Sequence, residues 1–333
     1  MLFDPVQIKQ LTIKNRLCMP PMCTYRAVDG VANFFHNAHY GTMINYGVGL
    51  VIIEATSVDP NGRISMEDMG IWDDKHIAPL KGIVDYAHEN NTVIMIQLAH
   101  AGRKTAKSLP QVGPTSEAYP NYLAPTAMSV ADIQALVSAY KQAARRARLA
   151  GFDGVEIHAA HGYLLHSFIS PKSNTRTDEY GGSESNRLRI VQEILTAIQA
   201  EFHGAIGIRF SAEEYIDDGY HIDDYVRIAK TMVEWGIDFI DVSSGGIHPV
   251  SIEVQPGYQV PFSHAIKSAV DVPVFAVGLI TEATQAEDIL TAGYADMIQV
   301  GKALLRDPGL PRRWAKELGA TLELKSPLNY PNL

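Results

Sequence analysis

Residues 154–163 place two imidazoles and a phenol at the end of a short apolar stretch. The segment reads Gly-Val-Glu-Ile-His-Ala-Ala-His-Gly-Tyr, and apolar and polar residues alternate over 155–158. That period of two is typical of a β-strand whose faces meet different surroundings. We therefore expect His158 at the C-terminal tip of a strand, with His161 and Tyr163 on the loop that leaves it.

Three interpretations of the two histidines compete. His158 and His161 could be two ligands of a metal, but no carboxylate or cysteine at a suitable spacing offers a third. They could be polar loop residues without chemistry of their own. They could also direct two N–H donors at one substrate oxygen, so that preorganised dipoles stabilise developing negative charge. The rest of the chain has to decide among them.

The composition indicates a cytoplasmic protein. The 333 residues are 46% hydrophobic and 20% charged, enough to bury the core of one barrel-sized domain. No apolar run has membrane-spanning length, and the first residues lack the basic and apolar regions of a signal peptide. A net charge of -9 without a dense basic stripe disfavours nucleic acid. We expect neither membrane nor nucleic acid as a partner.

Two cysteines, Cys18 and Cys23, are too few for a disulfide framework and form no Cys-x-x-Cys pair. They indicate a reducing compartment. They also exclude an iron–sulfur cluster held by four thiolates of this chain.

Eight short apolar segments, each ending in polar residues or glycine, predict eight strands. They are residues 17–19, 50–55, 93–97, 155–158, 206–209, 239–243, 274–278 and 297–301. Helical segments lie between them at 74–90, 129–150, 185–202, 222–235 and 282–292, with stops at Gly151, Gly204, Gly236 and Gly293. Residues 5–13 predict a small N-terminal hairpin.

Repeated alternation of strand and helix predicts an α/β protein with a single (β/α)8 TIM barrel spanning residues 1–333 as one domain. A doubly wound open sheet is the main competitor, but no Gly-x-Gly-x-x-Gly follows the first strand. Barrel enzymes place catalysis at the C-terminal ends of the strands. Those ends carry Cys23, Gln97, His158, Arg209 and Ser243. Two long connections, 110–128 and 162–184, leave the same face and either act as lids or simply cover the mouth.

Glycines after the last two strands favour a phosphorylated ligand. Gly278 follows the seventh strand, and Gly301 and Lys302 follow the eighth, where barrels often bind phosphate. Glycine permits close backbone approach, and Lys302 adds positive charge. One glycine at a strand end is often only a turn residue, so the prediction depends on the pair.

Two polar side chains suit the edge of a ring. Arg209 should point into the barrel, because Ile206 and Ile208 occupy the other face, and a buried guanidinium needs an anionic partner. That partner could be Glu156, a ligand whose ring becomes anionic on reduction, or both. Gln97 offers a donor and an acceptor to a heterocycle, unless it only caps a loop.

The segment Pro-Pro-Met-Cys-Thr-Tyr at 20–25 is a rigid turn beyond the first strand, and it holds a thiol and a phenol at little entropic cost. Cys23 could equally be a small packing residue.

Four motifs together resemble the Old Yellow Enzyme family of FMN-dependent ene-reductases, in its bacterial thermophilic-like subclass. They are Pro-Pro-Met-Cys-x-Tyr, Ile-Gln-Leu-x-His-Ala-Gly-Arg, Glu-Ile-His-Ala-Ala-His-Gly-Tyr-Leu and Asn-x-Arg-x-Asp-Glu-Tyr-Gly-Gly-Ser-x-x-Asn-Arg. The similarity runs in order from about residue 3 to about residue 310.

The resemblance implies a role for each matching residue. Contacts with the FMN ring are implied for Pro20, Pro21, Met22, Cys23, Ala55, Gln97 and Arg209. Contacts with the FMN phosphate are implied for Gly278, Gly301 and Lys302. His158 and His161 would bind the substrate carbonyl oxygen, with a further contact from Tyr25.

The implied reaction is reduction of the C=C bond of an α,β-unsaturated ketone, aldehyde or imide. NAD(P)H would reduce the flavin, flavin N5 would deliver hydride to the β-carbon, and Tyr163 would protonate the α-carbon. Hydrogen bonds from the two histidines would strengthen as the oxygen becomes enolate-like.

Two positions depart from the family pattern. Gly301-Lys302 replaces Gly-Arg, so the charge remains but the bidentate fork is lost, and FMN should be held less tightly. Relatives of this subclass also end with an arginine that reaches into a neighbouring active site, whereas no arginine follows Arg313 here. A homodimer or homotetramer would have to use Tyr330 instead, or leave the active sites separate.

Other functions stay open at this point. Enoate and dienoyl reductases have a similar first domain but need a cysteine cluster and further domains. A flavin-binding protein with little turnover, or a barrel for another phosphorylated ligand, would share the same strand-end residues.

Overall fold

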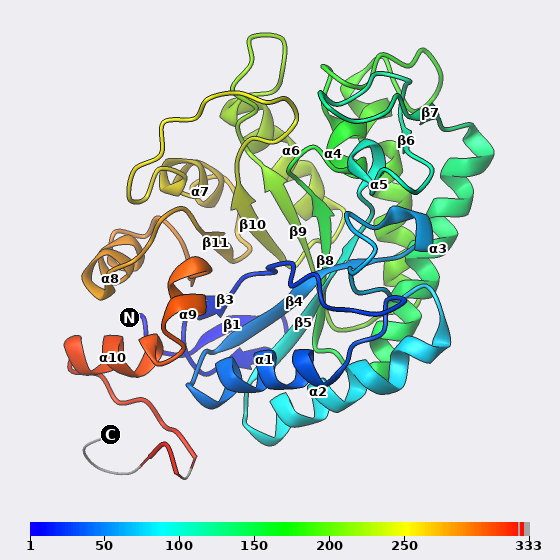
Figure 1. The fold of residues 1–333 in the computed structure, drawn as a ribbon. Coiled ribbons are helices and arrows are strands. Elements are labelled where there is room, and N and C mark those ends of the chain that lie inside the picture. Colours follow the sequence, from blue (N-terminus) through cyan, green and yellow to red (C-terminus); the bar gives the residue numbers. More distant parts are fainter. Residues whose placement is uncertain (326, 330–333) are drawn as a thin grey trace.

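Eight parallel strands close into a barrel at the centre of the molecule (Figure 1). The computed structural model describes residues 1–325 and 327–329. The strands follow one another around the barrel in chain order, and the last pairs with the first. They are β3 (Leu17–Met19), β4 (Leu50–Ser57), β5 (Val93–Ala99), β8 (Gly154–Ala159), β9 (Ala205–Ser211), β10 (Phe239–Ser243), β11 (Val274–Ala276) and β12 (Met297–Gln299). The predicted (β/α)8 TIM barrel is confirmed.

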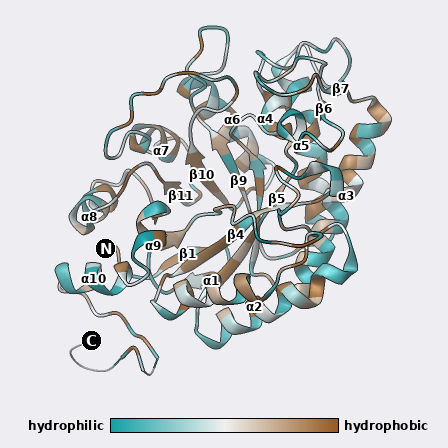
Figure 2. Cartoon of the chain, viewed as in Figure 1, coloured by the Kyte–Doolittle hydropathy of each residue, from teal (hydrophilic) through white to brown (hydrophobic). Residues whose placement is uncertain are grey.

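Helices surround the barrel and turn their apolar sides toward it (Figure 2). The longer ones are α1 (Phe34–Asn45), α2 (Ile77–Glu89), α3 (Val130–Ala150), α5 (Glu184–Gln199), α6 (Ile222–Glu234), α7 (Val260–Lys267), α8 (Ala283–Thr291) and α10 (Leu310–Glu317). Shorter elements lie in the connections: α4 (Leu164–Ile169), α9 (Lys302–Arg306), η1 (Pro60–Gly62), η2 (Asp74–His76), η3 (Gly102–Lys104), β6 (Val112–Gly113) and β7 (Thr126–Ala127). Within the described residues, no helix is both long and apolar enough to cross a membrane.

The five predicted helices are present, but α1, α4, α7, α9 and α10 were not predicted. Helix α1 mixes aromatic, histidine and small residues without a clear apolar stripe, and its start is marked only by the capping box of Asn33. Helix α4 lies inside the predicted lid 162–184, and the strands β6 and β7 lie inside the other, 110–128. Short elements carry too little periodicity to stand out in a sequence.

The predicted helix stops are right at three glycines and wrong at the fourth. Gly151, Gly236 and Gly293 follow α3, α6 and α8 with φ values of 92°, 99° and 73°, the left-handed geometry that favours glycine. Helix α5 ends five residues before Gly204. A Cβ on Gly204 would lie 2.3 Å from Asp153 O, so this glycine permits a close backbone approach instead.

The N-terminal hairpin closes one end of the barrel. Strands β1 (Val6–Ile8) and β2 (Leu11–Ile13) pair antiparallel, as predicted for residues 5–13. Their apolar residues pack against the lower barrel interior, where the rings of Phe239 and Phe275 stack with centroids 4.9 Å apart. This end of the barrel interior is therefore apolar, and the polar interior residues lie at the opposite, C-terminal end.

Candidate active site

The polar residues predicted at the strand ends gather at the C-terminal mouth of the barrel. Strand register sets His158 beside Arg209, and Arg209 beside Asp241. Gln97 lies beside Glu156 in the same way. The structure therefore brings together side chains that lie far apart in the sequence.

His158 and His161 are adjacent, with ring centroids 5.3 Å apart. His158 Nδ1 accepts the Ala160 N–H at 3.3 Å, which leaves its proton on Nε2. His161 Nε2 is 2.7 Å from Ser243 Oγ. The remaining nitrogen of each ring has no hydrogen bond to a residue that the structure describes. Each imidazole thus keeps one nitrogen for a ligand.

Both imidazoles are held neutral. Burial lowers the pKa of His158 and of His161 well below the usual value of 6.5, and the nearby Arg209 guanidinium lowers both further. A neutral imidazole offers one N–H donor without a full charge. Across residues 1–325 and 327–329, no group of three His, Cys, Asp or Glu residues could hold a metal ion, so a metal at these histidines has no third ligand there.

Tyr163 belongs to the same cluster. Its ring centroid lies 5.0 Å from that of His158, and the residue stands at the N-terminal boundary of α4. Burial raises the pKa of the Tyr163 phenol, and Cys23 and Tyr25 nearby raise it further. The phenol therefore keeps its proton until a strong base forms beside it.

Lys104 supports this loop and was not predicted as a site residue. Its Nζ donates to His161 O at 2.7 Å and to Gly246 O at 2.9 Å, and lies 5.4 Å from the centre of the Tyr163 ring. Burial lowers the pKa of Lys104 to about 8. The sequence feature that could have identified Lys104 is its position directly after the His-Ala-Gly-Arg motif.

The rigid turn at 20–25 is anchored by a buried carboxylate. Glu54 accepts the Thr24 N–H at 2.7 Å, the Thr24 hydroxyl at 2.9 Å and the Tyr40 hydroxyl at 2.9 Å. Burial raises the pKa of Glu54 to about 7. Thr24 stands between Cys23 and Tyr25, so this anchor sets the position of both.

Cys23 faces the backbone of Ala55 at the end of β4. Burial, followed by Asp68 and Glu54, raises the pKa of the Cys23 thiol to about 12, so it stays neutral at physiological pH. Tyr25 has a φ of 54° and is 47% exposed, and its phenol lies beside the Cys23 thiol.

Arg209 pairs with a residue that was not predicted. Its Nε lies 3.3 Å from Asp241 Oδ2, and no ion pair with Glu156 forms. Glu156, one of the two partners considered, is therefore not the residue that pairs with Arg209. The residues of β10, Phe-Ile-Asp-Val-Ser, alternate in a way that could have predicted that Asp241 points into the barrel.

Gln97 uses one of its two amide donors within the protein. Its Nε2 donates to Glu156 Oε1 at 2.7 Å, which leaves the second N–H and the carbonyl oxygen for a ligand. Burial raises the pKa of both Glu156 and Asp241, and that of Glu156 also rises because Asp241 lies near. A proton on Glu156 leaves one negative charge beside Arg209, which avoids an unpaired buried anion.

The predicted phosphate residues lie on adjacent strand ends. Gly278 has a φ of 121°, and a Cβ there would lie 3.1 Å from Gln259. A Cβ on Gly301 would lie 3.1 Å from Met22 Sδ and 3.5 Å from Pro20 Cγ, which brings the 20–25 turn beside this end. Lys302 is exposed and forms no ion pair with a described residue.

Nearly the whole chain matches proteins of known type. Residues 1–320 match the NADH:flavin oxidoreductase / NADH oxidase family. The chain belongs to this family. It is 46% identical to the NADPH dehydrogenase of Bacillus cytotoxicus over 332 residues, which cover 99% of this chain and 95% of that protein. The NADPH dehydrogenase of Bacillus subtilis (strain 168) is also 46% identical, with 99% and 98% covered.

Solved structures of the family share the barrel. Morphinone reductase superposes with a TM-score of 0.84 at 28% identity, over 98% of this chain and 92% of that one. The old yellow enzyme homologue from Zymomonas mobilis gives a TM-score of 0.83 at 28% identity, over 100% and 99%. The resemblance to the Old Yellow Enzyme family is confirmed, and the chain is an NAD(P)H-dependent flavin oxidoreductase with FMN as its cofactor.

The residues at the barrel mouth fit this cofactor. The Arg209 side chain is only 9% exposed, and apart from its ion pair with Asp241 its guanidinium forms no hydrogen bond with a described residue. Its Nε lies 3.3 Å from Asp241 Oδ2 but meets no acceptor with hydrogen-bond geometry in the described structure. Such an arginine needs an electron-rich group, and the carbonyl edge of a flavin supplies one.

Proposed function

We propose that this chain is an ene-reductase that reduces the C=C bond of α,β-unsaturated ketones, aldehydes or imides. The observation that carries the proposal is the pair of adjacent neutral imidazoles, His158 and His161, each with one ring nitrogen unused in the described structure. His158 donates from Nε2, and His161 donates from Nδ1 in the tautomer whose Nε2 accepts the Ser243 hydroxyl. Two such donors suit one carbonyl oxygen whose negative charge grows during the reaction.

The residues have distinct roles in this proposal. FMN, when bound, supplies the hydride at its N5 atom. His158 and His161 hold the substrate oxygen, and their hydrogen bonds strengthen as that oxygen gains charge, so they stabilise the transition state more than the ground state. Tyr163 gives its proton to the α-carbon, and Tyr25 contacts the substrate from the exposed side.

The cofactor residues are assigned in the same proposal. Arg209 and the Gln97 carbonyl would meet the pyrimidine edge of FMN, while the 20–23 turn and Ala55 would lie along its ring. The FMN phosphate would be held by Gly278, Gly301 and Lys302. Within the structure's described range both cysteines are free, which suits the proposed cytoplasmic location. One domain over 1–333, and a homodimer or homotetramer, stay predictions; Tyr330 lies outside the described residues.

The test uses the purified holoprotein under anaerobic conditions. NADPH should bleach the flavin absorption band, and addition of 2-cyclohexenone should restore it with formation of cyclohexanone. Bleaching by NADPH that oxygen reverses but cyclohexenone does not would overturn the ene-reductase assignment. A matched saturated ketone, cyclohexanone, controls for recovery that does not need a C=C bond.

A further inference from the structure

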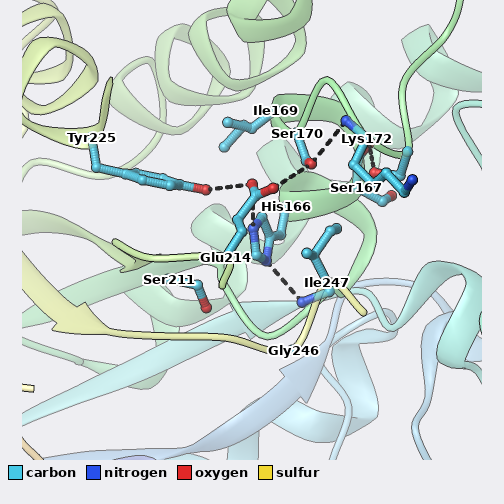
Figure 3. A network of polar contacts seen from close by, with 12 residues as sticks. His166, Ser167, Ile169, Ser170, Lys172, Ser211, Glu214, Tyr225, Gly246 and Ile247 are labelled. Atoms are coloured by element: carbon cyan, nitrogen blue, oxygen red, sulfur yellow. Dashed lines mark hydrogen bonds and ion pairs between the residues drawn. The ribbon is translucent and has the colours of Figure 1, made fainter. Parts of the chain in front are cut away.

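A buried histidine and a buried carboxylate, His166 and Glu214, face each other (Figure 3). The histidine contacts Gly162, which lies in the loop that carries His161 and Tyr163. His166 is on α4, Glu214 follows β9, and both have 0% relative exposure. His166 Nε2 lies 3.2 Å from Glu214 Oε1. Neither residue belongs to the groups assigned above to FMN or substrate.

The loop itself has a backbone that needs support. His161 and Gly162 have φ values of 58° and 72°, both in the left-handed region. A Cβ on Gly162 would lie 2.1 Å from Gly246 O, so the two backbones are in close contact. Strained backbone of this kind persists only where the surroundings hold it.

His166 holds this backbone directly. The Gly162 N–H donates to His166 Nδ1 at 2.8 Å, and Gly162 is the residue between His161 and Tyr163. A nitrogen that accepts an N–H carries no proton itself, so the proton of neutral His166 is on Nε2. That proton points at Glu214.

Glu214 fixes this arrangement from the other side (Figure 3). Its Oε2 accepts the Ser170 hydroxyl at 2.8 Å, and its Oε1 accepts the Tyr225 hydroxyl at 3.2 Å in addition to His166. A carboxylate presents acceptors only, so it selects the Nε2–H tautomer of His166. The opposite tautomer would place two N–H donors face to face at Gly162.

We propose that Glu214 and His166 are positioning residues for the reaction. The carboxylate sets the tautomer of His166, the tautomer holds Gly162, and Gly162 sets where His161 and Tyr163 meet the substrate. The inference rests on the proposed ene-reductase function. It adds the contacts that keep the oxygen-binding His161 and the proton-donating Tyr163 in their positions relative to each other. A merely structural pair would need only to satisfy its own buried atoms.

Two substitutions of His166 separate these possibilities, because each keeps one of its two contacts. In His166→Asn the amide oxygen replaces Nδ1 and can still accept the Gly162 N–H, but the link to Glu214 is lost. In His166→Gln the amide nitrogen reaches the place of Nε2 and can still donate to Glu214, but Gly162 loses its acceptor. Tyr225→Phe is the matched control, since it removes another donor to Glu214 and leaves Gly162 untouched.

The measurements are the affinity of oxidised holoprotein for 2-cyclohexenone, the rate at which cyclohexenone reoxidises the reduced flavin, and the melting temperature. A displacement of about 1 Å can slow a reaction about 100-fold. We expect His166→Gln to lose about tenfold or more in affinity and rate, and His166→Asn to stay within about threefold of wild type. Stability should follow the opposite order, because His166→Asn leaves the buried Glu214 with one donor fewer.

If the loss of activity in the three variants is proportional to the loss in melting temperature, His166 and Glu214 have only a structural role. A second measurement does not depend on enone turnover: ¹⁵N NMR of histidine-labelled protein should show His166 protonated at Nε2 and bare at Nδ1. A proton on Nδ1 would overturn the inference even if the enzyme is active. A wild-type protein that fails to reduce cyclohexenone but shows the Nε2–H tautomer would instead remove the proposed function.

Discussion

Arg209 and Asp241 form an ion pair inside the barrel, with 3.3 Å between Arg209 Nε and Asp241 Oδ2. Asp241 offsets the arginine charge that would otherwise favour an anionic reduced flavin. We expect Asp241→Asn to raise the flavin reduction potential and Arg209→Gln to lower it. A shift of about 30 mV corresponds to about 1.4 kcal/mol for a two-electron couple, and shifts of at least this size should appear in equilibrium dye titrations. Shifts of the same sign in both variants would contradict the charge argument.

The paired histidines should matter for the substrate and not for the cofactor. We expect the double variant His158→Ala/His161→Ala to slow reoxidation by cyclohexenone about 100-fold or more, by analogy with the loss of oxyanion donors. The ratio of flavin to protein should stay at the wild-type value, as read from absorbance. His203→Ala, at an exposed position after α5, controls for the loss of a histidine as such. Wild-type turnover in the double variant would refute the assignment.

Tyr163 should act in protonation alone. Removing a general acid typically costs about 100-fold to 10,000-fold, so Tyr163→Phe should slow cyclohexenone reduction within that range. The rate of flavin reduction by NADPH should change little, because that step needs no proton from the phenol. Stopped-flow absorbance separates the two half-reactions, and Tyr86→Phe on the outer helix α2 is the matched control. Equal slowing of both half-reactions would mean that the phenol has another role.

The pH profile of the oxidative half-reaction should have an alkaline limb but no acid limb near 6.5. His158 and His161 keep their protonation state there, because burial and Arg209 hold their pKa values well below 6.5. Lys104 loses its charge as pH rises through its lowered pKa of about 8. Hydrogen bonds from a charged lysine are stronger than those from a neutral one by about 1 kcal/mol. Loss of the Lys104 charge should therefore lower the rate about fivefold. Lys104→Met should abolish this limb, and an unchanged limb in that variant would exclude Lys104 as its source.

Glu54 gives a prediction for stability. Its pKa is raised from 4.5 to about 7 in the folded protein, so the folded state keeps a proton that the unfolded chain has lost. The free energy of unfolding should therefore fall as pH rises from about 4.5 to about 7, by on the order of 3 kcal/mol. Denaturant titrations of wild type and Glu54→Gln at several pH values measure this, since only the wild type should show the loss. A constant difference between the two proteins would contradict the prediction.

Lys302→Arg should strengthen the binding of FMN. An arginine offers a planar fork to a phosphate, whereas lysine offers a point charge. Adding one charge-assisted hydrogen bond of about 1.5 kcal/mol would tighten binding about tenfold, measurable by quenching of free FMN fluorescence on addition of apoprotein. Lys316→Arg, the same change on α10, should leave the affinity unchanged. Weaker binding in Lys302→Arg would show that the site does not accept the fork.

The amino-acid sequence by itself determined the eight strands, the longer helices and the residues at the strand tips. These features depend on local alternation of apolar and polar residues, on helix stops and on motif spacing, which are properties of neighbouring residues. His158, Gln97 and Arg209 were placed at the barrel mouth for that reason. Helix α1 was not predicted because its apolar residues form no regular stripe, and α7 was not predicted because its eight residues are too few to show one clearly.

Only the tertiary structure decided which of these side chains meet. Asp241, rather than Glu156, pairs with Arg209 because the register between β9 and β10 aligns them. His166 and Glu214 lie 48 residues apart and face each other only after α4 packs behind the loop at 160–163. Such contacts depend on strand register and helix packing across the whole barrel, so no local pattern in the chain records them.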